Sequence, residues 1–304
     1  MDYDGRIIKK VRQELGLNQA ELAELVFLSE DQLSRIERGK VKADIWLLMK
    51  ILELKGEPSD DFWMLYLDSD DYDGYLLYRQ LRRSLRDDKL NEAGELLEKL
   101  EKSPVSEKGF IKQTIVWTKL RLDDALSDED KLAGFYKVLK MSKPNFDESK
   151  LAEYRLTYQE IRILIIIAVL SGKMKDFDKA IYITKTLIEN RENFRTSEDD
   201  KMFFFPLLFF NLSNFYGKAD KIKDSLWACD EGIKASLKYA NYRFLPQLTL
   251  NKASGMYLLG EEEEMYKPLL VRAYYTALTH QNDKTANLIK SEAKEEFGII
   301  GFPH

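Results

Sequence analysis

Leucine, lysine, glutamate and alanine recur at intervals of three and four residues along almost the whole chain, while proline (7) and glycine (15) are scarce. Apolar residues at this spacing lie on one face of an α-helix, so the pattern predicts an all-α protein. Beyond residue 74 we expect helices that pair as helical hairpins, at 75–86, 90–102, 107–122, 128–141, 148–171, 175–190, 198–217, 221–239, 242–259, 262–280 and 283–297.

One break in the helical pattern divides the chain. With 304 residues the chain exceeds the usual size of one small domain, so two domains are the starting expectation. The apolar periodicity lapses at residues 68–74, an acidic and turn-rich segment that reads DSDDYDG, after a short helix that we expect to begin near Ser59. We therefore predict a small domain at residues 1–68 and a larger helical domain at residues 69–304.

The small domain begins with two predicted helices. The first spans residues 6–15 and carries its apolar residues on one side, at Ile7, Ile8, Val11 and Leu15. The second starts after Leu17, where Asn18 and Glu21 have the spacing of a capping box.

The third predicted helix of the small domain has the clearest start. Ser29 stands at the N-cap position with Gln32 three residues later, so we expect this helix to begin at Glu30. Two short helices joined by the few residues around Phe27 form a compact corner. Such a corner presents the start of its second helix to the DNA major groove.

This corner resembles the DNA-binding domain of phage-type repressors, the Xre-like family, over residues 6–55. The segments LGLNQAELAELV and LSRIERGK carry the resemblance in order and spacing. Phe27 stands where the family usually has glycine, so we expect the turn to differ somewhat here. The resemblance implies binding of double-stranded DNA as a homodimer, on a palindromic operator whose half-sites lie one helical turn apart, about 34 Å.

The resemblance also implies roles for single residues. Gln19 looks like the residue that bonds a phosphate and braces the recognition helix. The positions that read base edges are Ser29, Glu30, Asp31 and Gln32. The positions that contact the DNA backbone are Arg12, Arg35, Arg38, Lys40 and Lys42.

Charge and capping leave alternatives open at these positions. Glu30 and Asp31 either complement the helix dipole or accept from a cytosine amino group, and Gln32 either caps its own helix or binds adenine. The net charge is −5, and residues 1–56 hold ten basic and ten acidic residues. Any DNA contact must therefore be local, and four bases lie between residues 35 and 42.

The fullest repeat in the larger domain combines Leu212, Ser213, Tyr216, Ser225 and Gly232. These residues put small side chains where the two helices of a hairpin must approach closely, and their spacing resembles a tetratricopeptide repeat. Residues 85–104 and 168–187 fit the pattern in part. We predict a right-handed tetratricopeptide-like solenoid, with an irregular α-helical bundle as the alternative.

A helix-turn-helix domain joined to helical repeats resembles the Rgg/PlcR-type peptide-responsive regulators, the RRNPP family of Gram-positive bacteria. The resemblance spans the whole chain in architecture and length. It implies that the repeats form a concave groove for a short signalling peptide, and that peptide binding alters the dimer or its DNA-binding arms.

The predicted groove has several candidate contacts. Asparagine offers a donor and an acceptor to a peptide backbone, and Asn251 follows Asn214 by 37 residues, about one repeat. The peptide-binding candidates are Asn211, Asn214, Asn251, Tyr158 and Arg162, the last two in a stripe with Tyr154 and Arg155. The alternative for each is ordinary solvation, capping or packing. The phenylalanines at 203–205, 209 and 210 are predicted core, with one or two rings in apolar peptide pockets.

Several function classes have no support in the sequence. The single cysteine, Cys229, cannot form an intramolecular disulfide, which fits a reducing cytoplasm. His280 and His304 have no nucleophile at a meaningful spacing, and neither GxGxxG nor GxxxxGK[ST] occurs. We therefore expect a protein that is not an enzyme and that holds no metal and no cofactor.

We also expect no secretory signal and no membrane segment. The first residues, MDYDGRIIKK, have no apolar stretch after their charges, and the apolar runs at 161–170 and 202–212 are too short to cross a bilayer. The sequence thus predicts a cytoplasmic, peptide-controlled DNA-binding transcription regulator. The alternative is a helical-repeat scaffold for a protein partner, with the DNA domain as a tether or autoregulator.

Overall fold

The structure is a computed structural model, and it describes residues 5–43, 72–196 and 198–298, together with residues 47, 50, 51 and 54. The chain divides into two compact units, Met1–Ile115 and Val116–His304. The predicted boundary at residue 68 and the short helix near Ser59 lie outside the described residues, so both stay predictions.

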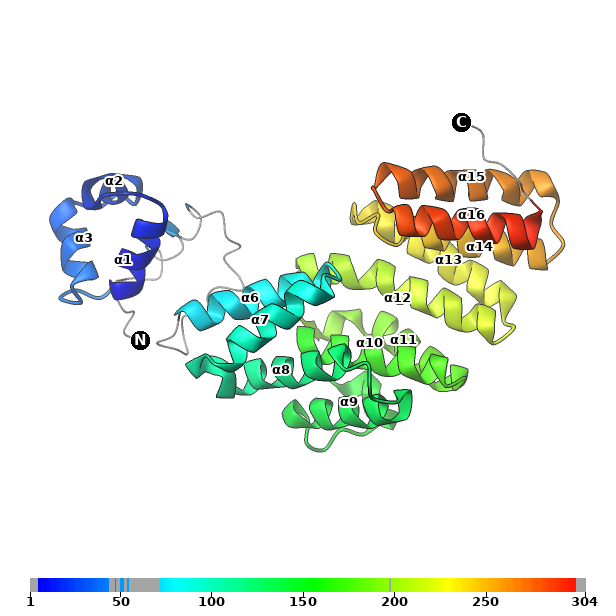
Figure 1. Cartoon of the computed structure of the whole chain (residues 1–304), viewed down its shortest axis with the longest axis horizontal. Coiled ribbons are helices and arrows are strands. Elements are labelled where there is room, and N and C mark those ends of the chain that lie inside the picture. Colours follow the sequence, from blue (N-terminus) through cyan, green and yellow to red (C-terminus); the bar gives the residue numbers. More distant parts are fainter. Residues whose placement is uncertain are drawn as a thin grey trace. The chain divides into compact units, whose positions relative to one another are not determined.

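Three short helices open the chain and pack on one another: α1 (Gly5–Glu14), α2 (Gln19–Leu25) and α3 (Glu30–Glu37) (Figure 1). Their apolar faces meet in a core that includes Ile8, Val11, Leu22, Leu33 and Ile36. A Cβ atom at Gly5 would lie only 1.8 Å from the carbonyl oxygen of Ile36. The start of α1 therefore abuts the end of α3.

The rest of the described chain is a series of helices with two short strands. The helices are α6 (Tyr72–Arg86), α7 (Leu90–Glu101), α8 (Gly109–Leu122), α9 (Asp128–Ser142), α10 (Tyr158–Lys173), α11 (Phe177–Glu189), α12 (Glu198–Lys218), α13 (Ile222–Lys238), α14 (Leu245–Leu258), α15 (Glu263–Thr279) and α16 (Asp283–Phe297). Short 3₁₀ segments lie at Pro104–Glu107, Glu148–Glu153 and Arg191–Asn193. The all-α prediction is confirmed, and most helix ends fall within three residues of the predicted ones.

The predicted helix at 148–171 is wrong at its start. Residues 148–153 form a 3₁₀ turn, and β1 (Leu156–Thr157) pairs in parallel with β2 (Phe194–Arg195) before α10 begins. Thr157 and Glu160 form a capping box that fixes the start of α10, because Glu160 Oε2 accepts from the Thr157 amide at 2.8 Å. Tyr154 and Arg155 therefore precede α10 and do not continue its face.

The helices from α9 to α16 stack as a repeat array. Each helix packs on the next one in the chain, and α10, α12, α14 and α16 also contact one another in turn. In Figure 1 the final pair, α15 and α16, lies side by side. Such nearest-neighbour stacking is the architecture of helical-repeat proteins, so the predicted repeat fold is confirmed.

Small residues set the distance between α12 and its neighbours. Ser225 Oγ of α13 donates to the carbonyl oxygen of Ser213 in α12 at 2.9 Å, and both serines are buried. A Cβ atom at Gly232 would lie 2.7 Å from a methyl carbon of Leu248 and 2.9 Å from Cβ of Phe209. The small positions of the predicted repeat therefore lie where helices approach most closely.

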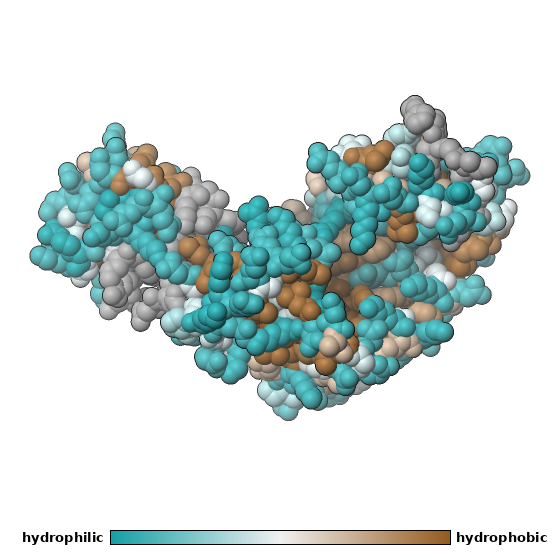
Figure 2. Space-filling view, viewed as in Figure 1, coloured by the Kyte–Doolittle hydropathy of each residue, from teal (hydrophilic) through white to brown (hydrophobic). Residues whose placement is uncertain are grey.

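The surface is largely hydrophilic, as expected for helices that bury their apolar faces. The face in Figure 2 is mostly hydrophilic, with hydrophobic residues in smaller areas. Within the described segments, no helix has both the length and the apolar character that crossing a membrane requires.

The close approach at Gly232 gives a test of the packing. Gly232→Ala should lower the free energy of unfolding by about 1–3 kcal/mol, because the methyl group must displace well-packed neighbours. Thermal and urea unfolding measure the change. Gly217→Ala in α12 is the control: its Cβ would meet only Ser225 Oγ, at 3.6 Å, so stability should stay equal or rise by up to about 1 kcal/mol through helix propensity. Equal effects of the two changes would contradict this packing.

Candidate DNA-binding and ligand-binding sites

Two capping boxes hold the helix-turn-helix corner. At α2, Asn18 Oδ1 accepts from the Glu21 amide at 2.9 Å and Glu21 Oε2 accepts from the Asn18 amide at 2.7 Å. At α3, Ser29 Oγ accepts from the Gln32 amide at 3.2 Å and Gln32 Oε1 accepts from the Ser29 amide at 2.9 Å. Both predicted helix starts are confirmed, and Gln32 caps its own helix.

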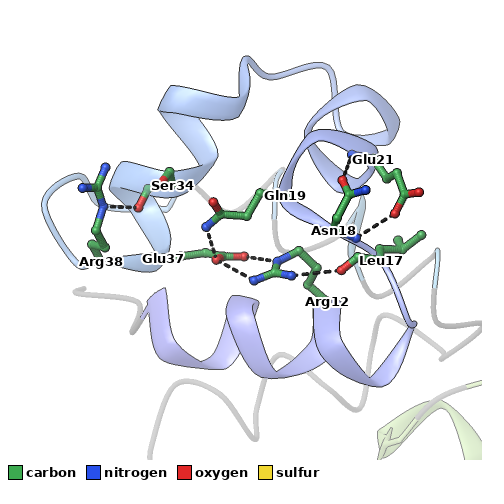
Figure 3. A network of polar contacts seen from close by, with 8 residues as sticks. All are labelled: Arg12, Leu17, Asn18, Gln19, Glu21, Ser34, Glu37 and Arg38. Carbon is green, nitrogen blue, oxygen red and sulfur yellow. Dashed lines mark hydrogen bonds and ion pairs between the residues drawn. The ribbon is translucent and has the colours of Figure 1, made fainter.

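A buried ion pair joins α1 to α3 (Figure 3). Arg12 Nε of α1 lies 2.6 Å from Oε1 of Glu37 in α3, and the second Glu37 oxygen accepts from Arg12 Nη2 at 3.0 Å. The Glu37 side chain is 1% exposed. The hydrogen bond to Glu37 raises the pKa of Arg12, which outweighs the opposing effect of desolvation.

The same carboxylate also holds α2. Gln19 Nε2 donates to Glu37 Oε2 at 2.7 Å, so the first residue of α2 braces the end of the recognition helix. Arg12 Nη1 donates to the carbonyl oxygen of Leu17 at 2.9 Å. The expected phosphate contact of Arg12 is therefore corrected: its side chain is 11% exposed, and its guanidinium is bound inside the domain. Glu37 has no role in the sequence-based prediction, although an acid on an apolar helix face is a signal of such a pair.

The other predicted DNA contacts lie on the surface. Glu30 and Asp31 occupy the first turn of α3, where their charges complement the helix dipole. Arg38 Nε donates to the carbonyl oxygen of Ser34 at the end of α3, at 3.0 Å. Exposed side chains at the predicted contact positions are Ser29, Glu30, Asp31, Gln32, Arg35, Arg38, Lys40 and Lys42.

The turn between α2 and α3 contains a strained aromatic residue. Phe27 takes a left-handed backbone conformation with φ 59°, which favours glycine and costs other residues roughly 1–2 kcal/mol. Its side chain is 88% exposed. The turn therefore keeps a backbone that suits glycine, and the unusual feature at this position is the exposed ring.

The second candidate site lies along α10, α12 and α14. On α12, three half-buried apolar side chains recur at helical spacing, at Phe203, Leu207 and Phe210. The ring of Phe244, which caps α14, lies 5.5 Å from Phe210 and 6.4 Å from Phe203. We term the four residues Phe203, Leu207, Phe210 and Phe244 the apolar stripe. The neighbouring rings of Phe204, Phe205 and Phe209 are buried core. The core role predicted for these phenylalanines holds for Phe204, Phe205 and Phe209, whereas a peptide pocket at Phe203 and Phe210 stays a prediction.

Tyr158 and Arg162 lie near the start of α10. The guanidinium of Arg162 lies over the ring of Trp117 at 4.1 Å and over Tyr158 at 5.5 Å. Arg162 is 6% exposed, and Tyr158 is half-buried against Phe204, with ring centroids 5.3 Å apart. Cation–π packing therefore accounts for much of the position of Arg162.

The three candidate asparagines lie on α12, at Asn211 and Asn214, and on α14, at Asn251. Asn251 Nδ2 donates to Asn214 Oδ1 at 2.8 Å and to Ser213 Oγ at 2.9 Å. Asn214 and Asn251 are half-buried, whereas Asn211 is 8% exposed. The structure thus joins Asn214 and Asn251 across neighbouring repeats, in a hydrogen-bonded pair that any ligand must extend or replace.

The buried ion pair can be tested by removing one partner. Arg12→Ala should lower the free energy of unfolding by about 3–5 kcal/mol, because it leaves the Glu37 charge buried and unpaired. Thermal unfolding of the full chain measures this. The double variant Arg12→Met/Glu37→Leu should recover most of the loss, and Arg38→Ala is the control for removal of an exposed arginine. A loss no larger for Arg12→Ala than for Arg38→Ala would contradict the assignment.

Residues 8–62 match a protein-family model described as Helix-turn-helix. No curated protein is similar enough in sequence to match the chain.

Solved structures match over nearly the full length. PlcR from Bacillus thuringiensis, in complex with the peptide PapR7 and DNA, is 18% identical, with a TM-score of 0.68 over 95% of this chain and 99% of PlcR. ComR from S. thermophilus, in complex with DNA and its signalling peptide ComS, is 17% identical, with a TM-score of 0.60 over 97% and 99%. The Streptococcus dysgalactiae SHP pheromone receptor Rgg2 is 15% identical, with a TM-score of 0.55 over 96% and 98%.

At these identities the likeness is one of fold, and it agrees with the resemblance drawn from the sequence. The chain combines a helix-turn-helix segment at residues 8–62 with the fold of the peptide-binding regulators PlcR and ComR.

Proposed function

We propose that this protein is a cytoplasmic, homodimeric DNA-binding transcription regulator whose activity is controlled by a short signalling peptide bound along α10, α12 and α14. The observation that carries the proposal is a braced helix-turn-helix with an exposed recognition helix, in a chain that shares its fold with PlcR and ComR. Both of those proteins are described in complex with DNA and a peptide. We infer action by binding rather than by catalysis.

The DNA-binding role follows from the exposed end of the small domain. The carboxylate of Glu37 holds α1 and α2 against α3, so the exposed side of α3 can enter the major groove as one rigid element. We assign phosphate contacts to Arg35, Arg38, Lys40 and Lys42, and base reading to Ser29, Glu30, Asp31 and Gln32. Arg12 acts by positioning the recognition helix.

The peptide-binding role follows from the second site's two parts, one apolar and one polar. The apolar stripe of Phe203, Leu207, Phe210 and Phe244 suits apolar side chains, whereas the amides of Asn214 and Asn251 suit a peptide backbone. Tyr158 and Arg162 lie at the start of α10 and Asn211 lies next to the stripe, and we retain all three as candidate contacts.

A homodimer suits both roles. A single helix-turn-helix binds DNA weakly, and two copies read two half-sites. Exposed apolar side chains on α14, α15 and α16 offer a surface for a second copy: Leu258 is 64% exposed, Met265 55% and Leu288 49%.

The DNA assignment can be tested by quantitative DNA retardation against an operator library. Arg35→Ala and Arg38→Ala should each weaken binding to all sequences, because each removes a phosphate contact. Each should also reduce the slope of the logarithm of the binding constant against the logarithm of salt concentration by about one. Lys137→Ala, an exposed lysine of α9, is the control and should change nothing.

Base reading by Gln32 needs a variant that keeps its helix cap. Gln32→Glu preserves the capping box, since glutamate serves at that position, but replaces the amide donor with a charge. We expect unchanged thermal stability and an altered base preference at one operator position. An unchanged preference would show that Gln32 only caps its helix.

The ligand assignment can be tested with short peptides encoded by open reading frames beside the gene. A peptide that binds only the native state raises its stability, by about 2.7 kcal/mol at 100 times the dissociation constant. Asn214→Ala should weaken peptide binding about fivefold, on the order of 1 kcal/mol for one hydrogen bond. Asn190→Ala is the control, because this asparagine bonds the Thr186 carbonyl at the end of α11. If no such peptide changes either thermal stability or DNA retardation, the sensor role is refuted.

A further inference from the structure

A surface cavity of about 820 Å³ lies where α14 and α16 begin. Its walls come from two segments, residues 240–243 before α14 and residues 280–284, which run from the end of α15 into the first turn of α16, together with Pro246. The two helices contact each other and lie side by side (Figure 1). The volume lies within the range of about 300–1,000 Å³ that is typical of small-ligand sites.

Contacts within and between the two segments give the cavity a defined shape. The rings of Tyr242 and His280, one from each segment, stack with centroids 5.5 Å apart and planes 24° apart. Gln247 Nε2 of α14 donates to Thr285 Oγ1 of α16 at 3.1 Å. Asn241 Nδ2 donates to the carbonyl oxygen of Met202, at 3.1 Å, which ties the first segment to α12.

The lining is rich in donors and positive charge. Arg243 and Lys284 contribute two cations against a single acid, Asp283. The amide oxygens of Asn241 and Asn282 already accept bonds from the backbone amides of Arg243 and Thr285, at 3.3 and 3.1 Å. The two cations in the lining thus favour a ligand with an anionic group.

Arg243 connects this cavity to the apolar stripe. Its guanidinium lies 5.9 Å from the ring of Phe203 and 5.8 Å from the ring of Phe244. A ligand that fills both places must carry an apolar side chain next to an anion. A free inorganic anion would occupy the cavity but would leave the stripe without a partner.

We propose that this cavity binds the free α-carboxylate of the signalling peptide, with the last apolar side chains of the peptide on the apolar stripe. This inference rests on the proposed function, and it specifies the orientation of the bound peptide. Its carboxyl end lies at the starts of α14 and α16, and its preceding backbone runs toward Asn214 and Asn251. Arginine suits this role because its planar guanidinium matches a carboxylate with two parallel hydrogen bonds.

The test compares two matched probes on the full-length protein: the tripeptide N-acetyl-Leu-Leu-Phe as the free acid and as its C-terminal amide. Calorimetry and thermal shift at millimolar concentration should show the acid binding at least about tenfold more tightly, since only the acid makes charge-assisted bonds. Arg243→Gln and Lys284→Gln should reduce this acid-to-amide ratio toward one. Lys290→Ala, an exposed lysine of α16 outside the cavity, should leave the ratio unchanged.

The outcomes separate this inference from the proposed function. Equal binding of acid and amide, or no binding of the acid at saturating millimolar concentration, would overturn the carboxylate site. The same holds if the acid is preferred but Arg243→Gln and Lys284→Gln keep the full ratio. Peptides from the neighbouring reading frames can still raise stability and alter DNA retardation in those cases, so the sensor role is judged by that separate measurement.

Discussion

The DNA-binding surface depends on one buried carboxylate, that of Glu37. It binds Arg12 of α1 and Gln19 of α2, so three helices meet at a single charged group inside an otherwise apolar core. Desolvation offsets much of the Coulomb energy of such a pair, which therefore adds little net stability compared with apolar residues. Its value is geometric, because the carboxylate ties α1 and α2 to α3 through hydrogen bonds of fixed direction. That arrangement exposes the side chains of Ser29, Glu30, Asp31, Gln32 and Arg35 on one rigid element.

Short polar contacts and small residues also position the repeats. The Ser225–Ser213 bond and the absence of a side chain at Gly232 bring α12 against its neighbours at close range. Because α10, α12 and α14 contact one another in turn, residues nearly forty positions apart become neighbours, as Asn214 and Asn251 do. The proposed ligand site therefore depends on the repeat period, and an insertion in one connection would misalign the apolar stripe and the asparagines.

The features that the sequence predicts are those set by local interactions. The capping boxes at Asn18 and Ser29 involve residues three apart, and the helix ends follow from apolar periodicity and its breakers. An acid on an apolar helix face, as at Glu37, indicates a buried partner, but that partner, Arg12, lies 25 residues away and local patterns do not identify it. The sequence alone therefore predicts a DNA contact for Arg12. The sequence contains the Thr157–Glu160 capping box, but the apolar pattern extends to both sides of it and so does not indicate the break before α10. Phe244 joins the apolar stripe only because α14 stacks on α12.

The asparagine pair constrains how a peptide can gain affinity. Asn251 already donates to Asn214 and Ser213, so a peptide that bonds these amides exchanges one set of hydrogen bonds for another. Such an exchange contributes little net free energy, about 1 kcal/mol or less for each bond. Burial of apolar surface against Phe203, Leu207 and Phe210 is not offset in this way, since those side chains are half-exposed without ligand. Affinity should therefore come mainly from the apolar stripe, while the asparagines reject ligands that leave their amides without a partner.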